Sequence, residues 1–375
     1  MNKRVLMVAT VPSMIGQFNM DNIRLLLDMG CQVDVACDFT DTSVWPEQRT
    51  KEFKERLSEL GIECFQLDFS RSPLKIKRHI DSYKETKKLI KERQYSFMHT
   101  HTPIASAIVR AAAHKLKTKV VYTAHGFHFY KGAPVRNWMI FYPVEKWLSK
   151  YTDALITITR EDFKRASEHF RAKNTVYVPG VGVDTKRFAA NPAGREKIRK
   201  ELSLSDDQVM LLSVGELNSN KNHGAVIRAI KGLDIVYVIV GKGALEEELK
   251  ALAEDNNVDL RLTGFRKDVE DFYQASDIYI LPSIREGLNV SLMEAMSSGL
   301  PCLAGRIRGN VDLIDEGDGG YLFDPKSEDE IRDAVSKMLD GATGTKAFGR
   351  YNFEKIKQFS KEVVAQKMSE IYRSM

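Results

Sequence analysis

The sequence has little cysteine and no long apolar run. Its 375 residues include four cysteines, and no two of them form a CxxC pair: Cys31, Cys37, Cys64 and Cys302. This usage excludes a disulfide-rich secreted scaffold and favours reduced thiols in a cytoplasmic protein. No apolar stretch approaches the roughly 18–20 residues that a membrane-spanning helix needs. Because a strand-like pattern begins at Val5, we expect no signal peptide before the fold.

The overall composition is that of an ordinary globular protein. Hydrophobic residues make up 43% of the chain and charged residues 29%, which excludes disordered, collagen-like and coiled-coil classes. Since a domain usually spans about 100–200 residues, the length favours two domains.

The net charge of +5 conceals an asymmetry. Residues 1–183 carry 29 Lys and Arg against 19 Asp and Glu, whereas residues 184–375 carry 27 against 32. A basic half joined to an acidic half indicates that the first half meets an anionic surface or polyanion.

Short β-branched runs alternate with longer amphipathic segments, which predicts parallel sheets with helices on both faces. The expected helices include 103–116, 191–202, 244–254 and 326–340. The expected strands are Val5–Thr10, Gln32–Cys37, Cys64–Leu67, Ser96–Thr100, Lys119–Ala124, Ala154–Thr157, Thr175–Val178, Val209–Val214, Ile235–Val240, Leu260–Thr263, Asp277–Leu281, Pro301–Ala304 and Gly320–Phe323.

One Pro and two Gly at positions 179–182 predict a hinge between the two sets of strands. We therefore expect two doubly wound, Rossmann-like α/β domains facing across a cleft, over residues 1–184 and 185–354. Apolar residues at helical spacing over about 353–373 predict a C-terminal helix. We expect this helix, about 355–375, to cross back to the first domain.

Two carboxylates eight residues apart, Glu286 and Glu294, follow the expected strand IYILPS. A helix over Val290–Ser298 would begin after the loop Arg285–Asn289, and its free N–H groups would form an anion site. Glu286 and Glu294 could then hold two ends of one extended ligand. Alternatively, Glu286 caps the helix and Glu294 is solvated.

The segment ASDIYILPSIREGLNVSLMEAMSSGLP (275–301) resembles the signature of the group 1, or family 4, glycosyltransferases of GT-B fold. Other blocks fit in the same order: SVGELNSNKNH, IVGKG, LTGFRKDV and GGYLFDP in the second half, with HTHTP and YTAHGFHFYKGAPVRNW in the first. The first-half blocks resemble the bacterial exopolysaccharide or capsule branch, and the resemblance covers essentially the whole chain.

The resemblance implies transfer of a sugar from a nucleotide donor with retention of configuration and without a metal. Glu286 would bind donor-sugar hydroxyls, and the backbone N–H groups of Gly287, Leu288 and Asn289 would meet the sugar and pyrophosphate. Glu294 would accept hydrogen bonds from both ribose hydroxyls.

Lys221 follows the strand Val209–Val214 and can neutralise a departing diphosphate, although alone it could be a solvated lysine. The family usually carries Arg five residues earlier, where this chain has Glu216. A carboxylate cannot stabilise a diphosphate, so Arg285, Arg306 and Arg308 stay open as substitutes.

Glycines and one aromatic complete the expected donor and acceptor contacts. Gly241 lies in a GxG pattern that is often only a tight turn. Gly264 and Phe265 resemble the family's base pocket, with Phe265 as a core residue the alternative. Gly16 falls in the expected loop Val11–Phe18, where such enzymes bring backbone close to donor phosphate and acceptor.

Four histidines, His99, His101, His125 and His128, follow or end expected strands. His125 matches the family histidine near the reaction centre, where it would position and polarise the substrate, with general-base action left open. His99 and His101 are expected to be structural hydrogen-bonding groups. Clustered histidines could also bind zinc, but the chain has no nearby Cys, no HExxH and no Asp-x-Asp, so we expect no metal.

Basic stretches concentrate in the first half. Residues 71–93 contain nine Lys and Arg against three acids, and residues 99–150 contain eight against one. The aromatic residues between 127 and 147 either form core or, with the bases, serve an anionic membrane surface and a lipid-linked saccharide acceptor. We expect no nucleic-acid partner and no cofactor beyond the nucleotide-sugar donor.

The sequence thus predicts a cytoplasmic, peripherally membrane-associated glycosyltransferase. It would move a hexose or N-acetylhexosamine from a UDP-sugar to a polyprenyl-diphosphate-linked glycan in surface polysaccharide biosynthesis. The alternatives are a GT-B epimerase or phosphorylase, a non-catalytic sugar-nucleotide-binding subunit, and a metal hydrolase built on the histidines.

Overall fold

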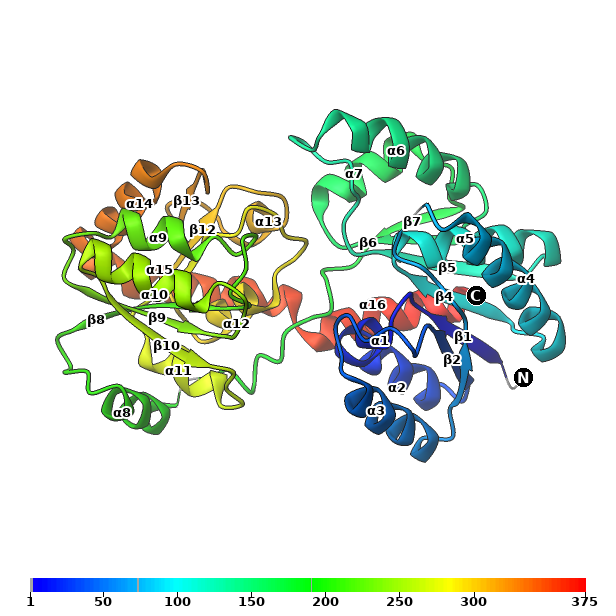
Figure 1. Ribbon diagram of the computed structural model, residues 1–375, viewed down its shortest axis with the longest axis horizontal. Helices are drawn as coiled ribbons and strands as arrows, with labels where there is room; N and C mark the ends of the chain where they lie inside the picture. The colour runs from blue at the N-terminus through cyan, green and yellow to red at the C-terminus, as the bar shows by residue number, and fades with distance from the viewer. Residues whose placement is uncertain (1–2, 73, 190) are drawn as a thin grey trace. The chain divides into compact units, whose positions relative to one another are not determined.

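The computed structural model describes residues 3–72, 74–189 and 191–375, with the backbone alone at 342–345. The chain divides into two compact units (Figure 1). Unit 1 comprises Met1–Val181 and Val364–Met375, and unit 2 comprises Gly182–Val363. Each unit is built on one parallel β-sheet with helices on both faces, so the predicted pair of Rossmann-like α/β folds is confirmed.

The sheet of unit 1 has the strand order β3-β2-β1-β4-β5-β6-β7, and all neighbouring pairs are parallel. The bounds are β1 Arg4–Val8, β2 Gln32–Cys37, β3 Glu63–Gln66, β4 Phe97–His101, β5 Lys119–Ala124, β6 Ala154–Thr157 and β7 Asn174–Tyr177.

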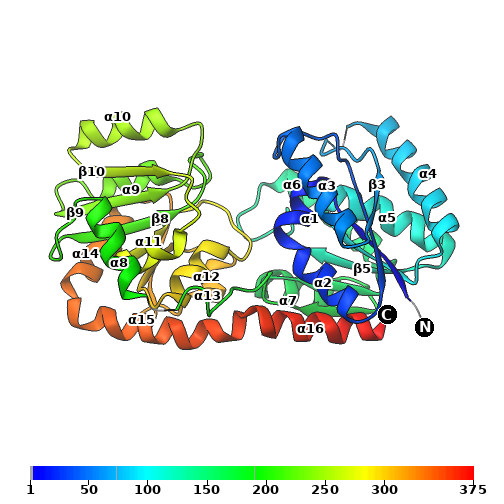
Figure 2. The same ribbon diagram turned by 90° about the horizontal axis from the view of Figure 1, so that it is seen from below.

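Helices cover both faces of this sheet because successive side chains of a strand point to opposite sides. Val5 and Met7 of β1 belong to a core with α2 and α16, whereas Leu6 and Val8 belong to a core with α4 and α5. Figure 2 shows α16 on one side of this sheet and α4 on the other. The bounds are α1 Pro12–Phe18, α2 Met20–Asp28, α3 Glu47–Glu59, α4 Ile76–Arg93, α5 Pro103–Leu116, α6 Val135–Ser149, α7 Arg160–His169 and α16 Lys361–Ser374.

The sheet of unit 2 has the order β10-β9-β8-β11-β12-β13 and is also parallel. Its strands are β8 Val209–Val214, β9 Ile235–Val240, β10 Asp259–Gly264, β11 Ile278–Leu281, β12 Cys302–Gly305 and β13 Gly320–Phe323. Its helices are α8 Pro192–Glu201, α9 His223–Ala229, α10 Glu246–Asn256, α11 Val269–Ala275, α12 Val290–Ser297, α13 Asn310–Leu313, α14 Glu328–Asp340 and α15 Ala342–Ile356.

The order of each sheet reverses once, between β1 and β4 in unit 1 and between β8 and β11 in unit 2. Ligands of doubly wound sheets bind beyond the carboxyl ends of strands at such a switch point. The loops after β8 and β11 hold Lys221 and Glu286, and the residues at the ends of β4 and β5 include His101 and His125.

The prediction that Gly16 lies in a loop is wrong. Residues Pro12–Phe18 form α1, with Pro at the first helical position, where its missing N–H costs nothing. A Cβ at Gly16 would lie 2.3 Å from the Trp45 ring, so this glycine gives α1 room to pack on Trp45.

The predicted C-terminal helix, about 355–375, returns to unit 1 as expected, but it begins only at Lys361. A 3₁₀ turn at Lys357–Phe359 and an extended Ser360 separate α15 from α16. Ser360 pairs with Val183, whose N–H donates to the Phe359 carbonyl and whose carbonyl accepts from the Lys361 N–H. The helix therefore breaks because the backbone at residues 359–361 forms hydrogen bonds with the backbone of Val183. Beyond the break, α16 packs on unit 1 through Val364, Met368, Ile371 and Tyr372.

Within the described ranges, every helix is too short or too polar to cross a bilayer.

Candidate functional site

Two loops at the switch point of unit 2 are bonded to each other. Asn220, after β8, donates from Nδ2 to the Arg285 carbonyl at 2.9 Å, and its own carbonyl accepts from the Ile284 N–H at 2.9 Å. Asn222 donates to the carbonyls of Pro282 and Pro325. These bonds fix the loop after β8 against the loop after β11.

This arrangement brings Lys221 and Glu286 into direct contact. Lys221 Nζ donates to Glu286 Oε1 at 2.8 Å, and both side chains are about five-sixths buried. The Lys221 stem lies over Gly215, where a Cβ would stand 3.1 Å from Cε. A partly buried ammonium beside a carboxylate offers a donor for phosphate and an acceptor for hydroxyls within one small volume.

Asn289, and not Glu286, caps helix α12. Asn289 Oδ1 accepts from the Leu292 N–H at 3.1 Å and from Ser291 Oγ at 2.8 Å. Of the two alternatives for Glu286, the capping role is therefore excluded. Because Asn289 caps the helix, the Glu286 side chain in the preceding loop is able to bond to Lys221.

Gly309 allows another chain segment to pass close to this loop. It has φ of +86°, and a Cβ there would lie 1.7 Å from the Gly287 carbonyl oxygen. Only glycine fits this approach, so Gly309 supports the backbone at Gly287 and Leu288. The sequence alone does not point to Gly309, because its contact joins the loops after β11 and β12, which lie about 20 residues apart along the chain.

Glu294 lies on α12, and its carboxylate is bonded to a neighbouring side chain and is not simply solvated. The Tyr273 hydroxyl donates to Glu294 Oε2 at 2.8 Å. Burial raises the pKa of the Glu294 carboxyl from its ordinary 4.5 to about 7, and the Tyr273 bond and the charge of Arg187 oppose that rise. Glu294 therefore changes charge near neutral pH. Tyr273 was not predicted, since its bond to Glu294 depends on the packing of α11 against α12.

Gly241 and Gly264 allow backbone segments to approach one another. A Cβ at Gly241 would lie 1.8 Å from the Gly215 carbonyl oxygen, and Gly241 forms a β-bridge with Gly264. Gly264 itself has φ of +70°. Phe265 is 71% exposed, which excludes the alternative that it belongs to the core.

The cations considered as replacements at Glu216 differ in availability. Arg306 forms two bonds with Glu316, at 2.8 and 2.9 Å, and is therefore already neutralised. Arg285 is exposed, Arg308 is half-buried, and Glu216 itself is exposed. The ion pair with Glu316 thus disfavours Arg306 as the substitute, and no choice between Arg285 and Arg308 follows from their exposure.

In unit 1, the histidines at the ends of β4 and β5 form a connected cluster. His101 Nδ1 lies 3.0 Å from His125 Nε2, and His101 Nε2 lies 3.2 Å from Met7 Sδ. His99 bonds to the hydroxyls of Tyr372 and Thr123, each at 2.8 Å. Burial lowers the pKa of His99 to about 3 and that of His125 to about 4, so both rings are neutral at pH 7.

The metal-hydrolase alternative finds no support in this geometry. Among the described residues, no group of three or more His, Cys, Asp or Glu side chains is placed to hold an ion. Both nitrogens of His99 and both of His101 already have partners.

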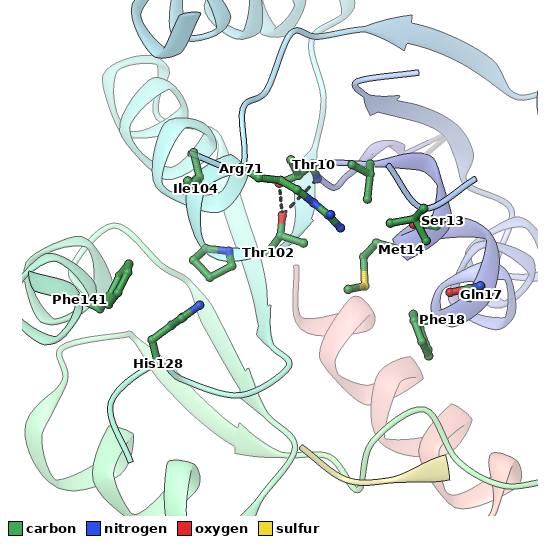
Figure 3. Close-up of a pocket in the computed structure, with 13 residues that line it drawn as sticks. Thr10, Ser13, Met14, Gln17, Phe18, Arg71, Thr102, Ile104, His128 and Phe141 are labelled. Atoms are coloured by element: carbon green, nitrogen blue, oxygen red, sulfur yellow. Dashed lines mark hydrogen bonds between the residues drawn. The ribbon is translucent and has the colours of Figure 1, made fainter. Parts of the chain in front are cut away.

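A pocket of about 420 Å³ opens beside this cluster in unit 1 (Figure 3). Met14 and Phe18 of α1 line it together with His128 and Phe141, and Arg71 contributes a cation. The ring of His128 stacks on that of Phe141 with centroids 4.6 Å apart. The sequence does not predict a pocket here, because its lining comes from six separate segments of the chain.

Thr102 stands at the rim of this pocket in a strained conformation. Its φ is +68°, which is an outlier for a β-branched residue. Its hydroxyl bonds to the Thr10 hydroxyl at 2.7 Å and accepts from the Thr10 N–H at 3.1 Å (Figure 3). Such strain persists only where neighbours enforce it, and it concentrates at binding sites.

Comparisons with known proteins follow the division into two units. Residues 16–187 match the family model described as Glycosyltransferase Family 4, and residues 194–355 match Glycosyl transferases group 1. Relatives include EpsD of Bacillus subtilis (strain 168), named as a glycosyltransferase, which is 31% identical over 99% of this chain and 97% of its own length. The UDP-Gal:alpha-D-GlcNAc-diphosphoundecaprenol alpha-1,3-galactosyltransferase of Escherichia coli is 31% identical over 68% of each chain.

Solved structures share the fold at lower identity. Anabaena HepE in complex with UDP superposes with a TM-score of 0.80 at 17% identity, over 99% of this chain and all of HepE. WaaG, a glycosyltransferase involved in lipopolysaccharide biosynthesis, superposes with a TM-score of 0.71 at 18% identity, over 98% and 99% of the two chains. Together with the match along the full length of EpsD, these findings confirm the resemblance: the chain belongs to the group 1 glycosyltransferases and has their GT-B fold.

Proposed function

We propose that this glycosyltransferase transfers a hexose or N-acetylhexosamine from a UDP-sugar to a polyprenyl-diphosphate-linked glycan, with retention and without a metal. The observation that carries the proposal is the Lys221–Glu286 pair at the switch point of unit 2, with Glu294 eight residues further on, in α12. One solved structure of the same fold contains UDP, and one relative is named for a UDP-galactose donor and a diphosphoundecaprenol acceptor.

Donor binding would exchange the partners of the pair. In the structure, Lys221 neutralises Glu286. A diphosphate carries more negative charge than one carboxylate, so it would draw the ammonium away and release Glu286 to accept from sugar hydroxyls. The N–H groups of Gly287, Leu288 and Asn289 would meet the sugar and pyrophosphate, as at other helix N-termini.

Further residues would hold the nucleoside. Glu294, when ionised, would accept from both ribose hydroxyls. Exposed Phe265, beside Gly264, would cover one face of the base. Gly241 would keep the backbone close to the site, and His125 would orient the transferred sugar. Gly16 supports α1 by packing and is not part of this proposal.

The reaction breaks the bond from sugar C1 to the diphosphate oxygen and forms the glycosidic bond from C1 to the acceptor oxygen. The proton of the acceptor hydroxyl leaves to the departing diphosphate, so the products are UDP and the extended glycan. Lys221 would stabilise the charge that develops on the leaving diphosphate. No side chain of the protein forms a covalent bond to the sugar in this proposal.

The acceptor would enter the pocket of unit 1. The pocket combines apolar walls from Met14, Phe18 and Phe141 with the Arg71 guanidinium. A polyprenyl-diphosphate glycan offers the matching groups, namely an apolar chain, two phosphates and sugar hydroxyls. The combination of polar and apolar lining residues is therefore suited to this class of acceptor.

The outer face of α6 would lie on an anionic bilayer at the inner side of the plasma membrane. We define this face by its five exposed apolar side chains, Val135, Met139, Ile140, Val144 and Trp147. Arg136 and Lys146 belong to the same helix, and Lys150 is its C-cap. The helix has one acid, Glu145, which is buried and paired with Arg110 at 2.8 Å. Apolar and cationic side chains without exposed acids are typical of interfacial helices.

Vesicle sedimentation tests this surface. Wild-type protein should bind vesicles that contain phosphatidylglycerol and lose that binding with Met139→Glu and Trp147→Glu combined. Leu60→Glu, which changes an exposed apolar residue at the end of α3, is the matched control. Equal vesicle binding by the α6 variant and the wild type would contradict the proposal. If the wild type is a dimer and the α6 variant is a monomer, the face instead binds a second copy of the chain.

Mass spectrometry of acceptor extension tests the reaction itself. Wild-type protein is incubated with a panel of UDP-sugars and polyprenyl-diphosphate glycans, with membranes present. One donor should add one sugar mass to one acceptor and release UDP. A free epimerised nucleotide sugar or a sugar phosphate would instead identify an epimerase or phosphorylase, and UDP binding without any product would identify a non-catalytic subunit.

A further inference from the structure

Three residues of unit 1 form a chain of contacts that ends at His125. Met7 lies on β1, His101 is the last residue of β4, and His125 follows β5. His101 bonds to His125 through Nδ1 at 3.0 Å and contacts Met7 Sδ through Nε2 at 3.2 Å. Met7 and His101 are fully buried, whereas His125 is partly exposed.

The chemistry of the Met7 sulfur determines which atom donates in each of these contacts. A thioether carries no proton and can only accept, so the proton of His101 lies on Nε2. A neutral imidazole has one donor and one acceptor, and burial together with the neighbouring histidines holds the pKa of His101 well below its ordinary value. His101 Nδ1 is therefore an acceptor, and the proton in the 3.0 Å contact belongs to His125 Nε2.

We propose that Met7 and His101 hold His125 as the Nε2–H tautomer, so that Nδ1 is presented to the substrate as a hydrogen-bond acceptor. The inference rests on the proposed function, which places His125 beside the transferred sugar. His101 and Met7 are positioning residues in this scheme. They orient the ring of His125 and fix which nitrogen lacks a proton.

The arrangement separates this site from one built for general-base catalysis. A carboxylate behind a histidine stabilises the imidazolium, as in a catalytic triad. Here the partner is a neutral, buried imidazole whose ring lies 4.2 Å from that of His99. His99 is bonded to Tyr372 and Thr123, and the ring of Phe18 lies 6.4 Å from that of His125. None of these neighbours carries a negative charge that would hold an imidazolium, so in this scheme His125 accepts a hydrogen bond from a hydroxyl and does not take its proton.

Nitrogen NMR of the histidine rings tests the tautomer without any substrate. In ¹⁵N-labelled wild-type protein, His125 should show a protonated Nε2 and an unprotonated Nδ1, with the signals assigned by their loss in His125→Gln. Met7→Leu keeps the shape and removes the acceptor, so both tautomers of His101 and His125 should appear. A protonated Nδ1 on His125 in the wild type would overturn the inference.

Kinetics then test whether the tautomer matters. His101→Phe keeps a ring but has no acceptor, and it should lower kcat/KM for the donor about tenfold, the effect of one lost hydrogen bond. His101→Asn, whose Oδ1 can replace Nδ1 as an acceptor, should recover most of that loss. His101→Phe combined with His125→Ala should be no slower than His125→Ala alone. Additive losses, or equal losses in the Phe and Asn variants, would overturn the positioning role.

The two readouts keep this inference distinct from the proposed function. If the wild type transfers no sugar, the proposed function fails while the NMR result still decides the tautomer. If the wild type transfers sugar and His125 carries its proton on Nδ1, only the inference fails.

Discussion

Lys221 and Glu286 are 65 residues apart in the chain, and yet Lys221 Nζ donates to Glu286 Oε1 over 2.8 Å at the switch point of unit 2. The contact depends on β8 and β11 being neighbours in the sheet and on the bonds from Asn220 to the loop after β11. Since each side chain neutralises the other, the donor has to supply both a stronger anion for Lys221 and hydroxyls for Glu286. A nucleoside diphosphate sugar offers both groups in one molecule.

Donor affinity should depend on the ionisation of Glu294. Because the pKa of this carboxyl is raised to about 7, UDP binding should strengthen as pH rises from 6 to 8, when the carboxylate that accepts from ribose becomes populated. Glu294→Gln should bind more weakly at pH 8 and lose most of this pH dependence. Titration calorimetry of UDP at three pH values measures both effects, and the variant also corrects for ionisation of UDP itself.

The same pKa has a consequence for stability with the opposite sign. A carboxyl whose pKa is raised by folding favours the folded state at low pH and loses that contribution as pH rises through about 7. Glu294→Gln should therefore match the wild type near pH 4.5 and be more stable at pH 8, by on the order of 3 kcal/mol. An equal difference at both pH values would contradict the shift.

The cap at Asn289 should support both the helix and the loop before it. Asn289→Ala removes the bond to the Leu292 N–H and should destabilise unit 2 by about 1 kcal/mol. Asn289→Asp keeps an acceptor and should retain most of the stability. Circular dichroism in urea measures the change. A rise in donor KM for Ala but not for Asp would show that the cap also orders the loop at Glu286.

The buried Arg110–Glu145 pair should anchor α6. Arg110 is 1% exposed and donates to Glu145 at 2.8 Å. Glu145→Ala leaves this cation buried without its partner and should cost about 3–5 kcal/mol. Arg110→Met combined with Glu145→Leu should cost less than Glu145→Ala alone, because no charge is left unpaired. Tryptophan fluorescence reports this unit alone, since Trp45, Trp138 and Trp147 all lie in unit 1.

Gly182 should be needed for the stability of the contact between the segments around Val183 and Ser360. It has φ of +76°, and a Cβ there would lie 2.8 Å from the Lys361 Cα. Gly182→Ala should destabilise the protein by more than about 1 kcal/mol, since a side chain would break the pairing of Val183 with Ser360. Gly232→Ala is the control, because Gly232 has φ of +75° with open space around it. Similar losses in both variants would show that backbone strain alone, and not the contact, is responsible.

Much of the fold could be predicted because buried parallel strands have a strong local signal. Strands Gln32–Cys37, Lys119–Ala124 and Val209–Val214 begin and end as predicted. The break at Ser360 could not be predicted, because its cause is the backbone of Val183, almost 180 residues away along the chain. Helix α1 could have been predicted from Pro12, had Gly16 not indicated a loop.

The site residues could likewise be predicted where their position depends on local sequence, and not where it depends on contacts between distant segments. The signature segment placed Glu286 and Glu294 on a loop and its helix, since both positions follow from one strand and one helix start. The partners of these residues, Lys221 and Tyr273, depend on sheet order and helix packing. The contact between His99 and His101 could have been predicted from the sequence, because residues two apart on a strand point to the same side.

The rate of sugar transfer by Lys221→Ala and Glu286→Gln tests the central claim most directly. Lys231→Ala and Glu247→Gln, which change exposed residues of unit 2 in the same way, are the matched controls. Lys221→Ala should lower kcat about 100-fold and Glu286→Gln should lower kcat/KM at least about tenfold, while both controls keep the wild-type rate. Wild-type transfer rates in both site variants would contradict it.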